Sequence, residues 1–162
     1  MTALDIRDST RKIKNIDFQK GDILDIDCAL ERRFDLTTSL HALEHVGLGR
    51  YGDKIDPDGM FKALANCRRL TMTGGETLIA LPVIDGDKNI LEFNAQRLIA
   101  SKNYIEHMRR FFGSDQLAWW MCIDDDRTPI SGCEFSKLES ALHSFRGLGI
   151  VATSWVKSGD LQ

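Results

Sequence analysis

The residues best suited to chemistry lie together in a short stretch, His41 to Asp53 (HALEHVGLGRYGD). It holds two histidines, two acids, an arginine, a tyrosine and three glycines within thirteen positions. An arginine can bind a carboxylate or phosphate through its planar fork, and glycines allow tight turns and close approach to a ligand. This composition predicts a ligand-binding or catalytic loop. The alternative is a solvated surface loop whose charges pair with one another.

His41, Glu44 and His45 also have the HxxEH spacing of one class of zinc peptidases. In those enzymes two histidines on one helix face bind the metal, and the glutamate activates water. Here the motif directly follows a predicted strand, and Gly47 and Gly49 would break a helix. A zinc hydrolase is therefore the less favoured alternative, and we predict no metal ligands.

The elements that must position this loop alternate between strands and helices. Strands are predicted over Thr2–Ile6, Ile16–Phe18, Phe34–Leu40, Thr77–Val83 and Leu117–Ile123, with Cys133–Ser136 as an antiparallel partner of the last. Helices are predicted from Met60 to a stop at Gly74-Gly75, and from an N-cap at Ser101 to Gly113. The alternation predicts an α/β fold with a mostly parallel open sheet, in which ligands bind at the carboxyl ends of the strands.

Composition narrows the class of protein. A chain of 162 residues, 43% of them hydrophobic, suits one domain with a core. A net charge of -3 disfavours nucleic acid as a partner. The four cysteines lack metal-site spacing, and no apolar run is long enough to span a bilayer. We expect reduced thiols, no membrane partner and a cytoplasmic location.

The phrase LHALEHVGLGRYGD, at Leu40 to Asp53, carries a resemblance to a known family. The chain resembles class I S-adenosylmethionine-dependent methyltransferases, and within them an uncharacterised methyltransferase-like family of unknown function marked by this phrase. Further similar motifs follow in order: Asp56-Pro57-Asp58-Gly59, Gly74-Gly75, Leu81-Pro82-Val83, Phe93-Asn94-Ala95 with Arg97, and Gly132-Cys133-Glu134-Phe135 with Lys137. The resemblance covers residues 2 to 140. It implies a Rossmann-like domain over 1–140 and a C-terminal tail, 141–162, outside it.

The resemblance implies S-adenosylmethionine as cofactor and assigns residues to it. Asp5 would accept hydrogen bonds from the ribose hydroxyls, Asp22 from the adenine amino group, and Ile23 and Leu40 would line the cofactor site. A carboxylate suits both roles because it offers several acceptor positions and no donor. The alternatives are that Asp5 caps a turn or helix and that Asp22 forms a turn.

It also implies a catalytic group beside the methyl acceptor. Methyl transfer gains most from positioning the acceptor and removing its proton. We predict His45 as the base, Glu44 as the group that orients it or the substrate, and His41 as a further member. The residues expected to recognise the substrate are Arg50, Tyr51, Asp53, Asn94 and Arg97. A buried histidine that holds a loop carbonyl would give the same pattern.

The resemblance also implies a central first strand and a glycine-rich cofactor loop, and nothing before Thr2 supplies them. Three explanations are open: the sequence is a truncated part of an enzyme, the remaining strands close up as a non-catalytic binding or structural protein, or Gly149–Val156 replaces the strand. We expect methyl transfer to a small polar acceptor such as a sugar, with cofactor binding weak or lost in this chain. The oligomeric state is not predicted.

Overall fold

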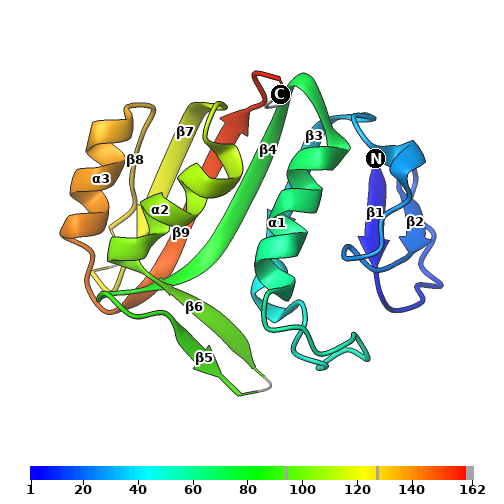
Figure 1. Cartoon of the computed structure of the whole chain (residues 1–162), viewed down its shortest axis with the longest axis horizontal. Helices are drawn as coiled ribbons and strands as arrows, with labels where there is room; N and C mark the ends of the chain where they lie inside the picture. The colour runs from blue at the N-terminus through cyan, green and yellow to red at the C-terminus, as the bar shows by residue number, and fades with distance from the viewer. Residues whose placement is uncertain (94, 127, 160–162) are drawn as a thin grey trace.

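The computed structural model describes residues 1–93, 95–126 and 128–159, and their strands form two separate sheets (Figure 1). The smaller sheet pairs β1 (Thr2–Asp5) with β2 (Asp17–Lys20) in parallel. The larger sheet has seven strands, in the order β5-β6-β4-β9-β7-β8, with β3 also paired to β4. The expected alternation of strands and helices therefore forms, but the strands divide between two sheets.

The strands of the larger sheet mostly run in one direction. Their bounds are β3 Phe34–Leu40, β4 Thr71–Ile84, β5 Ile90–Glu92, β6 Gln96–Ala100, β7 Gln116–Ile123, β8 Ile130–Gly132 and β9 Leu148–Val156. Strands β3 and β6 are parallel to β4, and β9 is antiparallel to both β4 and β7. Consequently β3, β4, β6 and β7 share a direction, which brings their carboxyl ends to one edge of the sheet.

Three helices cover one face of this sheet, the face toward the viewer in Figure 1. They are α1 (Gly59–Leu70), α2 (Ser101–Phe112) and α3 (Phe135–His143). Helix α1 buries Met60, Leu64 and Cys67, the stripe that its apolar spacing predicts. The core between helices and sheet is aromatic, because Trp155 of β9 stacks on Phe112 of α2 with ring centroids 5.3 Å apart.

The opposite face of β3 is apolar and open. Ser39 is buried, whereas Leu36 and Leu40, which alternate with it, are 54% and 61% exposed. Within the described residues β3 pairs only with β4, and β1 pairs only with β2. Each strand therefore presents an edge with free backbone groups, and the strands have not closed up against each other.

The C-terminal segment is a central strand. Strand β9 lies between β4 and β7, and Val151 and Trp155 are buried in the core. The expectation that Gly149–Val156 replaces the missing first strand is therefore wrong. Short β-branched runs give no information on which partner they will pair with, and here pairing on both edges decides the position.

Three local expectations also differ from the structure. Helix α1 ends at Leu70, and Gly74-Gly75 lies inside β4 beside the register shift between Phe34 and Leu36. The antiparallel partner of β7 is β8, and Phe135 begins a helix, so Cys133–Ser136 is not a strand. Ser101 is the first residue of α2 rather than its N-cap, which is Ala100.

The cysteines are unpaired in the structure. Cys67 and Cys122 are buried and Cys28 and Cys133 are exposed, all as free thiols. Burial raises the pKa of both Cys67 and Cys122 to about 12. None of the helices in the described part of the chain has the length and apolar character that crossing a membrane requires.

Candidate functional site

A buried carboxylate between two histidines lies directly after β3. Glu44 belongs to a single 3-10 turn, Leu43–His45, and its side chain is 1% exposed. The Nδ1 of His41 lies 3.2 Å from Glu44 Oε1, and the Nε2 of His45 lies 3.8 Å from the same oxygen. Glu44 Oε2 has no hydrogen-bond partner among the described residues. An unsatisfied buried oxygen beside two titratable rings is an arrangement typical of functional sites.

The backbone at this point is in an uncommon conformation. His41 has a φ of 55°, in the left-handed region that few residues other than glycine adopt. Its amide still donates to Ala80 O of β4 at 3.1 Å, so the turn leaves the sheet without losing that hydrogen bond. The turn places His41 and His45 on either side of Glu44, with 39% and 22% of their side chains exposed.

The glycine-rich segment that follows is organised by Asp53. Its Oδ2 accepts hydrogen bonds from the amides of Gly47 and Gly49 at 2.8 and 3.1 Å, and its Oδ1 accepts from Tyr51 N at 3.1 Å. Gly47 has a φ of 78°, and a Cβ there would lie 2.3 Å from Asp56 O. The glycines therefore permit the expected tight turn, and Asp53 uses its carboxylate inside the loop.

Two arginines connect this loop to the hairpin β5–β6. Arg97 of β6 donates to the carbonyls of Val46 and Asp56, the latter at 2.9 Å. Burial lowers the pKa of Arg97, although the nearby carboxylates of Asp56 and Asp53 act in the opposite sense. Arg50 donates to Ala95 O at 3.3 Å. The Arg97 guanidinium thus binds backbone carbonyls of the chain itself, which is a structural role.

The end of the small sheet reaches the same loop through an arginine. Asp5, the last residue of β1, is held by Arg7 through Nε–Oδ1 and Nη2–Oδ2 contacts of 3.0 and 2.9 Å. This side-chain hydrogen bond is the main cause that lowers the pKa of Asp5. The Arg7 guanidinium lies 4.8 Å from the centroid of the Tyr51 ring, and that ring meets His45 edge-on at 5.9 Å. Asp5 and His45 therefore belong to one continuous cluster.

Asp22 and Ile23 follow β2 beside Asp5. Gly21 N donates to Asp5 O at 3.0 Å, which fixes the two strand ends together. Asp22 Oδ1 accepts from Leu24 N at 2.9 Å, the geometry of a turn former. Ile23 packs against the hydrophobic core, and its carbonyl accepts a hydrogen bond from Asn66. Both side chains have structural uses, and their cofactor roles stay predictions.

Among the expected site residues, the structure brings together His41, Glu44, His45, Arg50, Tyr51, Asp53, Arg97 and Asp5. Leu40 lies at the end of β3 with its side chain exposed. Asn94 lies outside the described residues. Sequence reasoning missed Arg7 and Ala95. Arg7 could have been noticed as a base two residues after Asp5, whereas a backbone carbonyl such as that of Ala95 has no sequence signal.

The geometry of His41, Glu44 and His45 is not that of a zinc-peptidase HxxEH site. Leu43–His45 is one 3-10 turn, and His41 precedes it, so the two histidines do not lie on one face of an α-helix. In the parts of the chain that the structure describes, no group of three or more His, Cys, Asp or Glu side chains is placed to hold a metal ion.

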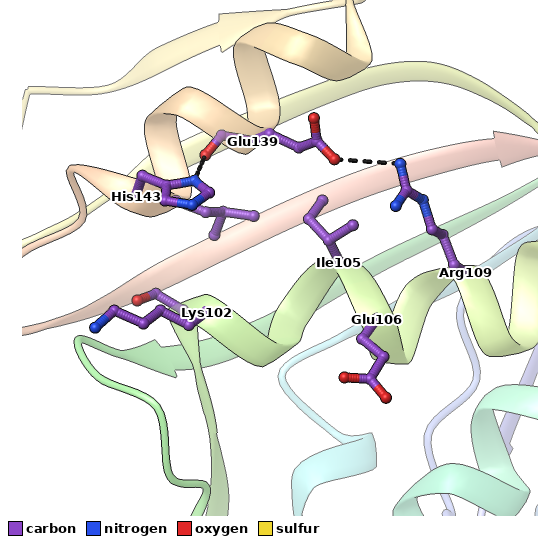
Figure 2. A pocket seen from close by; sticks show the side chains of 8 residues that line it. Lys102, Ile105, Glu106, Arg109, Glu139 and His143 are labelled. Atoms are coloured by element: carbon purple, nitrogen blue, oxygen red, sulfur yellow. Dashed lines mark hydrogen bonds and ion pairs between the residues drawn. The ribbon is translucent and has the colours of Figure 1, made fainter.

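Two surface hollows lie away from this cluster. One, of about 310 Å³, lies between α2 and α3, where Arg109 pairs with Glu139 at 3.2 Å and His143 contacts the Glu139 carbonyl (Figure 2). Another, of about 450 Å³, lies at the start of β4 beside Leu36 and Met72. Neither contains a residue predicted for the site.

The model of a protein family matches residues 2–130 of this chain, which is most of its length. The chain belongs to that family. It is described as "Caenorhabditis protein of unknown function, DUF268". The family match includes β1 to β7 and the histidine loop (His41–Asp53), and it ends before α3 and β9. A comparison with curated proteins gave no match.

Several solved structures have a similar fold. The 1,6-didemethyltoxoflavin-N1-methyltransferase of Burkholderia thailandensis, solved with 1,6-didemethyltoxoflavin and S-adenosylhomocysteine, matches 98% of this chain and 61% of its own, with a TM-score of 0.60 and 16% identity. Geranyl diphosphate methyltransferase, solved with geranyl diphosphate and sinefungin, matches 88% of this chain and 53% of its own, with a TM-score of 0.56 and 9% identity. The [4+2]-cyclase SpnF matches 90% of this chain and 58% of its own, with a TM-score of 0.57 and 12% identity.

These matches confirm the expected Rossmann-like α/β fold. At identities of 9 to 16% they show the fold alone, and one of the three is a cyclase, so the reaction does not follow from the fold. The chain spans less than two thirds of the length of these structures.

The two carboxylates expected to bind S-adenosylmethionine make hydrogen bonds within the chain. Both oxygens of Asp5 are engaged by Arg7, and one oxygen of Asp22 is engaged by its own turn. Within the described chain, the segments after β1 and β2 do not lead into an α-helix, so neither forms a glycine-rich turn facing a helix N-terminus. The structure does present a cluster of polar side chains around Glu44.

Proposed function

We propose that this chain provides the acceptor side of an S-adenosylmethionine-dependent methyltransferase that acts on a small polar molecule such as a sugar. The observation that carries the proposal is the buried Glu44 carboxylate between His41 and His45, at the carboxyl end of β3. Ligands bind at this edge in open α/β sheets. Two proteins of similar fold were solved with small molecules bound, one with 1,6-didemethyltoxoflavin and the other with geranyl diphosphate.

In this proposal His45 takes a proton from the acceptor, and Glu44 balances the positive charge that then develops on the ring. A carboxylate buried beside a histidine stabilises the imidazolium more strongly than one in water, because the local dielectric is low. Tyr51 and Arg50 form the neighbouring surface, with the Arg50 guanidinium 5.5 Å from the Tyr51 ring centroid. These two side chains are the proposed contacts to the substrate.

Methyl transfer tests the proposal. The protein isolated at its native length would be incubated with S-adenosylmethionine labelled in the methyl group and a panel of sugars and other small polar compounds. We expect label in at least one compound, and a loss of about 10²–10⁴ in rate for His45→Ala, which removes the base. His143→Ala, in α3, is the matched control and should keep full activity. No transfer to any compound, or full activity of His45→Ala, would overturn the proposal.

The 162-residue chain itself should bind S-adenosylmethionine weakly or not detectably. The reason is that Asp5 is occupied by Arg7 and that, within the described residues, neither the segment after β1 nor that after β2 leads through a glycine-rich turn into an α-helix. Isothermal titration calorimetry measures this directly. A micromolar dissociation constant for the chain would contradict the expectation.

A second proposal is a methyltransferase-like protein without catalysis, which binds or supports a partner. The ion pair between Asp5 and Arg7 favours this second proposal, because Arg7 occupies the carboxylate that a cofactor would need. The methyl-transfer assay separates the two functions. Transfer that depends on His45 excludes the non-catalytic protein, and its absence at native length favours it.

A further inference from the structure

The ring of His45 is oriented by the hairpin between β5 and β6. Its Nδ1 lies 2.6 Å from the carbonyl oxygen of Ala95. Because a carbonyl oxygen can only accept, Nδ1 must carry the proton and donate it. Neutral His45 therefore has a lone pair on Nε2. A neutral histidine side chain free in water favours the opposite form, with its proton on Nε2.

The free nitrogen points toward Glu44. Nε2 lies 3.8 Å from Glu44 Oε1, and that oxygen already accepts from His41 Nδ1 at 3.2 Å. Glu44 Oε2 is buried without a hydrogen-bond partner among the described residues. Two acceptors that face the same space need a donor hydrogen between them, because acceptors alone repel. The pair is thus arranged to receive a hydrogen from another molecule or to hold a proton on Nε2.

The carbonyl that sets this arrangement is itself held in place. Ala95 N donates to Glu92 O at 2.9 Å, which closes the hairpin turn. Arg97, two residues along, spans the loop by donating to Val46 O and Asp56 O. Val46 directly follows His45. Arg97 therefore ties the hairpin that carries the acceptor carbonyl to the loop that carries the ring, and Arg50 of that loop donates to Ala95 O itself at 3.3 Å.

We propose that Arg97 is a positioning residue which, through the Ala95 carbonyl, keeps the proton of neutral His45 on Nδ1 and leaves Nε2 as its basic atom. In the reaction, the acceptor's hydrogen moves to Nε2 while the electron pair of the broken bond stays on the acceptor atom. The imidazolium formed then has Nδ1–H on Ala95 and Nε2–H toward Glu44. The catalytic meaning of this arrangement rests on the proposed function, whereas the proton position does not.

Nitrogen NMR of the histidine rings tests the proton position in the whole chain. The protein has four histidines, so His45 can be assigned from the signal that His45→Gln removes. In ¹⁵N-labelled wild type at a pH where the rings are neutral, Nδ1 of His45 should have the shift of a protonated nitrogen and Nε2 that of an unprotonated one. The reverse pattern would overturn the proposal.

Arg97→Ala tests the role of the arginine. We expect a mixture of both proton positions at His45, because the 3.3 Å hydrogen bond from Arg50 to Ala95 O is then the arginine contact left between loop and hairpin. Arg109→Ala, which removes a surface ion pair with Glu139, is the control and should leave the ring signals unchanged. Arg97→Lys keeps one donor and should restore most of the wild-type pattern. An Arg97→Ala protein that folds, judged by its amide spectrum, and keeps the wild-type ring signals would overturn the role of Arg97.

The two proposals can fail separately. A native-length protein that transfers no methyl group but has the Nδ1–H form of His45 contradicts the proposed function alone. An active protein whose His45 carries its proton on Nε2 contradicts the positioning alone.

Discussion

Asp53 gives the histidine loop its shape by accepting hydrogen bonds from three backbone amides. Desolvation, the largest single influence, raises its pKa, but the amides of Tyr51, Gly49 and Gly47 together outweigh it, and the pKa lies below the ordinary value of 3.8. Since the folded state favours the charged form, Asp53 contributes stability above pH 3.8. That contribution is lost as the pH falls through the lowered pKa of the folded state.

Asp53→Asn should destabilise the chain by about 1–2 kcal/mol at pH 7, because the amide has one acceptor oxygen for three donors. The difference from wild type should shrink as the pH falls below 3.8, where Asp53 itself becomes protonated. Urea unfolding followed by circular dichroism between pH 7 and 2.5 measures both. Asp87→Asn, at an exposed position, is the control. A difference that stays constant with pH would show that the charge of Asp53 is not what holds the loop.

At the scale of elements, β9 fixes the larger sheet because it pairs on both sides. It pairs with β4 over nine residues and with β7 over seven, and its Trp155 fills the space between α2 and α3. The Trp155 ring contacts Phe112 face to face and Phe135 edge-on at 6.4 Å. This strand lies outside the family match and yet completes the core on which the matched residues depend.

Trp155→Ala should lower the free energy of unfolding by about 3–5 kcal/mol, as expected for the loss of a large aromatic side chain from a core. Trp119→Ala, in β7, offers a matched control because Trp119 is 38% exposed, and it should cost less than half as much. Urea unfolding monitored by far-ultraviolet circular dichroism gives both values. Similar losses for the two variants would contradict the central place of β9.

At the scale of the whole molecule, the open edge and exposed apolar face of β3 favour association between copies of the chain. Natural sheets protect such edges with charges or cover them, whereas Leu36 and Leu40 leave this one apolar. The chain should therefore associate as its concentration rises.

Leu36→Lys should reduce this association without lowering the stability of the fold, because Leu36 is 54% exposed. Leu148→Lys places the same charge on β9, where Leu148 is 48% exposed on a strand paired on both sides, and it should have no effect on association. Sedimentation at a series of concentrations distinguishes the variants. A wild type that stays monomeric at all concentrations would contradict the expectation.

Much of the fold follows from local patterns. The strand Phe34–Leu40 was predicted with its observed bounds, and the starts of α1 and α2 lie within one residue of the predicted ones. Hydrophobic spacing is a local property, so it can be read before the partners are known. The hairpin β5–β6 and helix α3 were not predicted, since short exposed strands and a nine-residue helix have weak periodicity.

The sequence by itself determined the fold class and the stretch His41–Asp53, because residue types and spacing are sufficient to indicate both. Only the tertiary structure decided what each side chain does. Asp53 and Arg97, expected at the substrate, hold the loop together, and Asp5 is paired with Arg7. Such roles depend on contacts between residues that are distant in the sequence, such as His45 with Ala95, fifty residues apart. A backbone carbonyl, which any residue could provide, leaves no trace in the sequence.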